Sequence, residues 1–196
     1  MSNLLSRFPR ELSLDGGEVT LRIMKPADEA AVMTFAKTLP AHDLLFLRRD
    51  ITQPKVLSAW VEELEAGTIT SLVAIQDDRV LGCSAVVRDE HSWSPHVGEL
   101  RVLLSPDVRA QGLGRTLIQE SFIVALAEGV EKLTAQMTAD QQAAIAVFEG
   151  IGFRAEALLR DHVRDREGEK HDIVILSHDV AEFQAKMDQY GLNDAF

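Results

Sequence analysis

The sequence HVGELRVLLSPDVRAQGLGRTLIQESFIVAL, residues 96–126, joins a strand-like run to a helix-like run through two glycines. Residues 96–105 are mostly apolar, which is typical of a buried strand. After Gly114, apolar residues recur at the spacing of a core-facing helix: Leu117, Ile118, Phe122, Ala125 and Leu126. A strand followed by a crossover helix predicts a layered α/β fold.

The turn between the two runs, residues 106–115, has the chemistry of an anion site. The first turn of a helix exposes N–H groups at the positive end of the helix dipole, and glycine lets an anion approach them closely. Such turns also occur in α/β proteins as plain connections without a ligand. Two common nucleotide loops do not fit: a dinucleotide fingerprint needs glycine where Leu117 stands, and a P-loop needs lysine where Arg115 stands.

The rest of the chain continues the same alternation of elements. Further strands are predicted at 19–24, 68–76, 79–89, 131–137, 153–160 and 171–180, and helices after Pro26, after Pro54 and over 141–151. Asp77 and Asp78 indicate a hairpin between two of the strands. We therefore expect a loose lead-in at 1–18, one α/β domain at 19–179 and a helical tail at 180–196.

Composition excludes several classes of protein. The chain has 196 residues, 46% of them hydrophobic, which suits one domain with a substantial core. Its net charge of −11 argues against binding to nucleic acid or to a membrane surface. The single cysteine, Cys83, excludes an internal disulfide and is expected to be a buried small hydrophobe. No leader and no apolar run of about 18 residues is found, so we expect a cytoplasmic protein.

Two motifs resemble those of the GNAT acyltransferases. Arg109-x-x-Gly112-x-Gly114 is similar to the acetyl-CoA signature of that family. The segment QQAAIAVFEGIGF, residues 141–153, resembles the family's second signature and follows at its usual separation. The resemblance implies a mixed, mostly antiparallel twisted sheet of six to seven strands, with helices on both faces and a splayed central pair of strands. It also implies acetyl-CoA as the cosubstrate, no metal, and acetyl transfer to an amine.

The resemblance also assigns the residues that hold the cosubstrate. The loop and the start of the next helix would bind the CoA diphosphate, through Arg109, Ala110, Gln111, Gly112, Leu113, Gly114 and Arg115. The backbone of Val102, Leu103 and Leu104 would pair with the pantetheine arm. Gln141 and Phe148 would complete the site, but they depart from the family's asparagine and tyrosine. Phe148 cannot protonate the departing thiolate, and Tyr190, in the tail, is the only tyrosine of the chain.

Glu99 is the candidate general base for the attacking amine. It stands in the middle of an apolar strand, where a carboxylate is unfavourable unless it is paired or used in chemistry. The alternative is an ion pair with Arg101, two residues along on the same face. His96, near the start of the strand, is a second candidate.

The acceptor is expected to be a primary amine, either a protein lysine or a small cationic amine. The resemblance places its site at residues 39–54 and 162–170. The acids of these segments, with Asp161 directly before the second, either form an acidic lip or are simply solvated: Asp43, Asp50, Asp161, Asp165, Glu167 and Glu169. A non-catalytic acyl-CoA sensor or scaffold of the same fold is the alternative function. A homodimer is compatible with the sequence.

Overall fold

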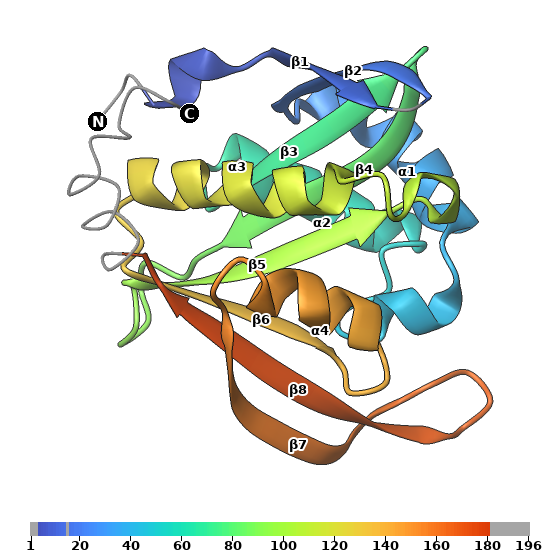
Figure 1. Ribbon diagram of the computed structural model, residues 1–196, viewed down its shortest axis with the longest axis vertical. Helices are drawn as coiled ribbons and strands as arrows, with labels where there is room; N and C mark the ends of the chain where they lie inside the picture. The colour runs from blue at the N-terminus through green and yellow to red at the C-terminus, as the bar shows by residue number, and fades with distance from the viewer. Residues whose placement is uncertain (1–3, 15, 181–196) are drawn as a thin grey trace.

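The computed structural model describes residues 4–14 and 16–180, which form one eight-stranded sheet in the order β1-β2-β3-β4-β5-β6-β8-β7 (Figure 1). The strands are β1 (Arg10–Leu14), β2 (Gly17–Ile23), β3 (Ile69–Gln76), β4 (Arg79–Val87), β5 (Val97–Leu104), β6 (Lys132–Thr138), β7 (Arg154–Arg164) and β8 (Lys170–Asp179). The helices are α1 (Glu29–Thr38), α2 (Pro54–Glu65), α3 (Leu113–Ala127) and α4 (Gln142–Glu149). Short 3-10 turns precede β1, α1 and α3 at Leu4–Arg7, Pro26–Asp28 and Pro106–Val108, and a fourth follows α1 at Ala41–Leu44.

The strand pair β5 and β6 divides the sheet. Every other neighbouring pair is antiparallel, whereas β5 and β6 run parallel and pair over three residues only, from Val97 with Lys132 to Glu99 with Thr134. Beyond Glu99 the two strands separate, and a wedge opens between them (Figure 1). The expected mixed α/β fold with a splayed central pair is therefore confirmed.

Helices cover both faces of the sheet, as the resemblance to the GNAT acyltransferases implied. On one face α3 and α4 pack over a core that contains Leu100, Phe122 and Phe153. On the other face α1 and α2 pack over a core that contains Phe35, Leu57 and Leu103. Since Leu100 and Leu103 belong to different cores, β5 contributes side chains to both layers.

The N-terminal segment differs from the loose lead-in that the sequence suggests. All five residues of β1 pair with β2, from Arg10 with Leu21 to Leu14 with Gly17, so the described strands number eight rather than six to seven. The segment is also fastened to α3, because Arg7 and Arg10 both donate to the buried carboxylate of Glu120. The polar sequence RELSL concealed this strand, which has no fully buried residue. The helical tail expected at 180–196 lies, beyond Val180, outside the described residues.

Replacing Glu120 with alanine should lower the free energy of unfolding by about 3 kcal/mol, because the two arginines then lose a buried counter-charge. The control is Glu156→Ala, which removes an exposed partner of Lys132 and should lower it by less than about 1 kcal/mol. Urea unfolding of the two variants measures the difference. Equal losses would show that Arg7 and Arg10 do not stabilise the fold through Glu120.

Candidate functional site

The loop between β5 and α3 forms an anion cradle. Ala110 and Gly112 both have positive φ, 61° and 88°, and α3 begins directly after Gly112. Within the described part of the chain, the amides of residues 113–115 make no hydrogen bond and no side chain caps the helix. These amides lie at the positive end of a 15-residue helix, and a Cβ placed on Gly112 would meet no atom within 4 Å. Open space over unsatisfied N–H groups fits a phosphate.

Two arginines flank this cradle, and they are engaged differently. Arg109 donates to Asp43 and, at 3.4 Å, to the carbonyl of Leu104, so it ties the loop to the segment after α1. Arg115 has no hydrogen bond or ion pair with any other described residue, and it lines the cavity above the loop. Arg115 is therefore the cation available to an anionic ligand.

The larger cavity runs from this loop into the wedge between β5 and β6, and its volume is about 480 Å³. Ten of the twelve residues expected to hold the cosubstrate line it: Val102, Leu103, Leu104, Arg109, Ala110, Gly112, Gly114, Arg115, Gln141 and Phe148. The other two do not. Gln111 turns its side chain to the carbonyl of Asp107, and Leu113 is fully buried in the core. Leu113 can therefore contact a ligand only through its backbone, and the Gln111 side chain is directed at Asp107.

The wedge exposes backbone on β5. Residues 100–104 of β5 pair with β4 on one side, and no described strand pairs with their other edge. An extended ligand with amide groups can occupy that edge, as a further strand does in β-augmentation. The side chains of Val102 and Leu104 pack against the α3 core, and the unpaired strand edge offers their backbone to the wedge.

The far wall of the cavity is formed by β6 and α4. Phe148 is buried and packs against Phe153 with ring centroids 5.0 Å apart, and it offers no proton to a ligand. Gln141 accepts a hydrogen bond from the Thr138 amide and donates one to Asp43 at 3.4 Å. Gln136 also lines the cavity, and sequence reasoning missed it. Its position on a strand that diverges from β5 was the signal that could have identified it.

The segment after α1 contributes to the same cavity, which sequence reasoning also missed. Leu39, Asp43 and Phe46 line the larger cavity, although the sequence assigns residues 39–54 to the acceptor alone. Asp43 holds both Arg109 and Gln141, so it connects the glycine loop to the start of α4. The segment therefore closes one side of the anion cradle.

Glu99 lies where β5 and β6 separate. Its two oxygens accept hydrogen bonds from Arg101 Nε at 2.9 Å and Nη2 at 3.1 Å, and Arg48 lies 4.0 Å away. The ion pair with Arg101, which the sequence offered as the alternative to a base, is therefore present. A carboxylate has about four lone-pair sites, so the pair still leaves acceptor capacity on Glu99. Glu99 and His96 line neither the larger cavity nor the smaller one on the other side of β5, but Arg101 lines the smaller one.

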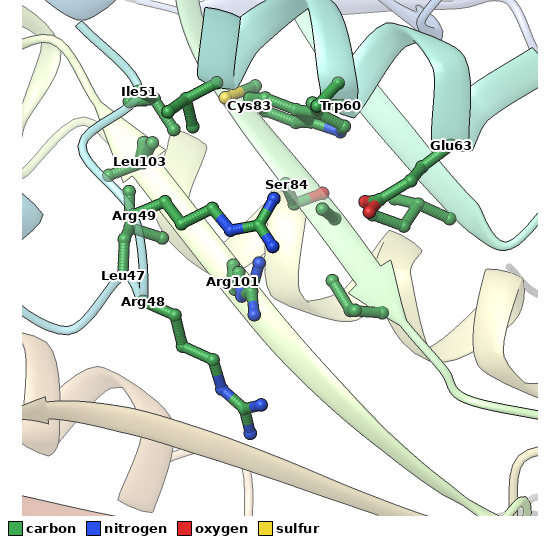
Figure 2. A pocket seen from close by; sticks show the side chains of 15 residues that line it. Leu47, Arg48, Arg49, Ile51, Trp60, Glu63, Cys83, Ser84, Arg101 and Leu103 are labelled. Carbon is green, nitrogen blue, oxygen red and sulfur yellow. The ribbon is translucent and has the colours of Figure 1, made fainter. Parts of the chain in front are cut away.

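The smaller cavity lies on the α1 and α2 side of β4 and β5, and its volume is about 190 Å³ (Figure 2). Leu47, Arg48, Arg49 and Ile51 approach it from the segment between α1 and α2. Leu103 lines both cavities. Ligands in the two cavities would therefore approach β5 from opposite faces and meet near its diverging edge.

Cys83 lines the smaller cavity but is 1% exposed, and burial raises the pKa of its thiol to about 12. The expected small buried hydrophobe is thus confirmed. We expect Cys83 to remain unlabelled by a thiol-specific disulfide reagent at pH 8, because the thiolate is the reacting form. Labelling should become complete in denaturant. Rapid labelling of the native protein would contradict this burial, and slow labelling keeps thiol-detecting assays free of background.

Two overlapping clusters contain the described residues that could hold a metal. Ligand atoms of His42, Asp140 and His171, and of Asp165, Glu169 and His171, lie within 4.8 Å of one another in each group. The histidines are already engaged: His42 lies 3.0 Å from Asp140, and His171 lies 2.8 Å from Asp165. The hydrogen bond that His171 donates to the Asp165 carboxylate raises the pKa of His171. The first contact connects the segment after α1 with the turn before α4, and the second connects β8 with the loop before it.

The two acidic loops do not present six unpaired charges. Four of the six acids hold a basic side chain: Asp43 with Arg109, Asp50 with Arg166, Asp161 with Lys170 and Asp165 with His171. Much of the negative charge expected at an acidic lip is therefore compensated locally.

A family model described as the acetyltransferase (GNAT) family matches residues 38–153, more than half of the chain. The chain belongs to the GNAT acetyltransferase family. The match includes the glycine loop, the wedge and α4, and it ends at the residue before β7. No helix among the described residues has the length and apolar character needed to cross a membrane.

Individual relatives match only part of the chain and at low sequence identity. The [ribosomal protein bS18]-alanine N-acetyltransferase of Escherichia coli K12 is 30% identical over 74 residues, which are 38% of this chain and 50% of that protein. N-alpha-acetyltransferase 30 of Schizosaccharomyces pombe is 24% identical over 108 residues, 55% of this chain and 72% of that protein. The chain thus spans about half the length of the first of these relatives.

Solved structures share the fold at low sequence identity. An N-acetyltransferase from Staphylococcus aureus Mu50 superposes with a TM-score of 0.73 at 17% identity, covering 83% of this chain and 98% of that one. The Salmonella typhimurium protein yncA, solved with its cofactor acetyl-CoA, gives a TM-score of 0.71 at 20% identity, with 83% and 94% covered. These likenesses confirm the GNAT fold.

Proposed function

We propose that this GNAT-family chain transfers the acetyl group of acetyl-CoA to a primary amine. The observation that carries the proposal is one continuous cavity that joins an anion cradle at the start of α3 to an unpaired strand edge on β5. A long ligand with phosphate at one end and amides along its arm needs that combination. The name of the bS18-alanine N-acetyltransferase and the acetyl-CoA held by the Salmonella structure support the same reaction.

In this proposal different residues of the larger cavity bind different parts of the cosubstrate. The amides of residues 113–115 and the side chain of Arg115 bind the diphosphate. The backbone of Val102, Leu103 and Leu104 binds the pantetheine arm and directs the thioester to the point where the strands diverge. The thioester supplies an activated acetyl group, and the chain positions it for attack.

Glu99 is the general base. An ammonium group cannot attack a carbonyl, so one proton must leave the amine before or during attack. Glu99 stands at the base of the wedge with spare acceptor capacity, and it takes that proton directly or through one water molecule. The amine nitrogen then bonds to the acetyl carbon, the bond from carbon to sulfur breaks, and the CoA sulfur leaves with the electron pair.

The departing thiolate takes its proton from water or from the acceptor. Phe148 carries no exchangeable proton, and Gln136 and Gln141 can donate a hydrogen bond but not a proton at neutral pH. The absence of an acid at these three positions makes the reaction slower, but it does not prevent it, because a thiol with an unperturbed pKa of about 8.5 is a tolerable leaving group.

The test is CoA-thiol release by the wild-type chain with acetyl-CoA and a panel of amines. The panel contains lysine-bearing peptides, peptides with N-terminal alanine, polyamines and amino acids. Tight binding of acetyl-CoA with no thiol release from any amine would favour the second candidate, a non-catalytic acyl-CoA sensor. Phe148 and Gln141 favour this second candidate, because they stand where the family has tyrosine and asparagine. Cytoplasmic location and a homodimer remain predictions.

A further inference from the structure

The smaller cavity is positively charged in a chain whose net charge is −11. Three arginines and one acid line it: Arg48, Arg49, Arg101 and Glu63. In Figure 2 the side chains of Arg49 and Arg101 both point toward the region of Ser84, while Arg48 extends away below them. Guanidinium groups gathered at one opening repel each other, so the arrangement favours an anion between them.

Only part of this positive charge is neutralised by the protein. Arg101 is held by both oxygens of Glu99, and Arg48 lies 4.0 Å from the same carboxylate. Arg49 has no hydrogen bond or ion pair with any described residue. One fork of N–H donors is therefore available, and a guanidinium binds a carboxylate through two parallel hydrogen bonds.

The walls of the cavity are apolar and fixed. Ile51 and Leu103 are almost fully buried, and the ring of Trp60 is held by a hydrogen bond of 3.0 Å from Nε1 to Ser71 Oγ. Ligand sites for drug-sized molecules occupy roughly 300–1,000 Å³, and this cavity, at about 190 Å³, is smaller. The site thus fits a compact ligand with an apolar body and an anionic head.

The position of the cavity connects it to the proposed reaction. Arg101 lines the smaller cavity and donates hydrogen bonds to Glu99. Leu103 lines both the smaller and the larger cavity. Because Arg101 both lines the smaller cavity and pairs with Glu99, a compact amine bound there can turn its nitrogen toward Glu99 while its opposite end lies at Arg49.

We propose that the acceptor is a small amine that carries a carboxylate, with an apolar group between or beside the two, and that Arg49 binds the carboxylate. This inference rests on the proposed acetyl transfer and narrows its substrate class. It departs from the cationic acceptor expected from the acidic loops, because the charge facing the cavity is basic. Arg48 adds to the positive potential at the rim.

The experiment compares matched acceptors in the CoA-release assay. Apolar L-amino acids and ω-amino acids are each assayed against their primary amides, which keep the amine and lose the carboxylate. Spermidine and short peptides with an acidic side chain are included. We expect kcat/KM to be about 10- to 100-fold higher for the carboxylate member, which is the size of the effect of one charge-assisted bidentate pair. High salt should reduce the difference.

The matched variants are Arg49→Gln and Arg160→Gln. Arg160 is an exposed arginine on β7 that lines neither described cavity. Arg49→Gln should raise the KM for the carboxylate acceptor about 10- to 100-fold. The KM for the matching amide and the Kd for acetyl-CoA should stay unchanged. Arg160→Gln should change the KM for neither the carboxylate nor the amide.

Each other outcome contradicts the inference. If spermidine or the amides are used as well as the carboxylates, or if Arg49→Gln affects both members equally, acetyl transfer stands and the carboxylate site is wrong. If only acidic peptides are acetylated, the acceptor is a polypeptide and the small-molecule assignment is wrong. If no amine releases CoA although acetyl-CoA binds, the proposed function fails and this inference fails with it.

Discussion

Replacing Glu99 with glutamine should lower kcat for acetyl transfer by about 100- to 10,000-fold at pH 7, the range typical of a lost general base. Glutamine has nearly the same shape and its carbonyl can still accept from Arg101, but it cannot take a proton from the amine. The loss should shrink as the pH approaches the pKa of the acceptor amine, because the amine then arrives unprotonated. The measurement is the pH profile of kcat and kcat/KM for both proteins.

Two control variants distinguish a general-base role of Glu99 from a purely structural ion pair with Arg101. Glu156→Gln removes the charge of another ion-paired strand carboxylate, and it should leave kcat unchanged. Glu99→Asp keeps a carboxylate and should retain more activity than Glu99→Gln. The Kd for acetyl-CoA should be the same in all three variants, since Glu99 does not border the larger cavity among the residues described. If Glu99→Gln matches the wild type at every pH, Glu99 serves only to hold Arg101.

The sequence was most informative where local geometry alone determines the structure. The Gly112 loop must adopt positive φ, so its spacing indicated both the turn and the start of α3. Asp77 and Asp78 likewise adopt φ of 48° and 63°, which makes the hairpin between β3 and β4 that their side chains suggested. Such positions can be read from one sequence, because few residues tolerate that backbone.

The sequence was least informative where the structure depends on contacts between distant segments. The strand β1 has no buried stripe, and its place depends on β2 and on Glu120, which lies 110 residues from Arg10. The charge of the smaller cavity comes from Arg48 and Arg49 on one segment and Arg101 on another. The acids nearby in sequence suggested the opposite sign, because their pairing with distant cations, such as Asp50 with Arg166, is invisible in the order of residues.

Replacing Gly112 with valine should weaken acetyl-CoA binding on the order of 100-fold, while Gly129→Val should leave it unchanged. The two glycines are matched: each has positive φ, 88° and 73°, each would place a Cβ in open space, and they flank opposite ends of α3. A β-branched residue at either position costs about 1–3 kcal/mol of backbone strain, which urea unfolding will report for both. Only Gly112 lines the larger cavity, beside the unpaired amides of residues 113–115.

The difference in acetyl-CoA affinity between the two variants therefore distinguishes a lost contact with the ligand from backbone strain. A valine at 112 draws the loop out of the conformation that presents its amides, and it fills the space where the diphosphate would lie. Calorimetric titration with acetyl-CoA gives the Kd of each variant, and desulfo-CoA serves as a ligand without a transferable group. Equal loss of affinity in the two variants would mean that α3 stability, rather than contact at the loop, controls binding. Equal retention would place the diphosphate elsewhere and remove the structural basis of the proposed function.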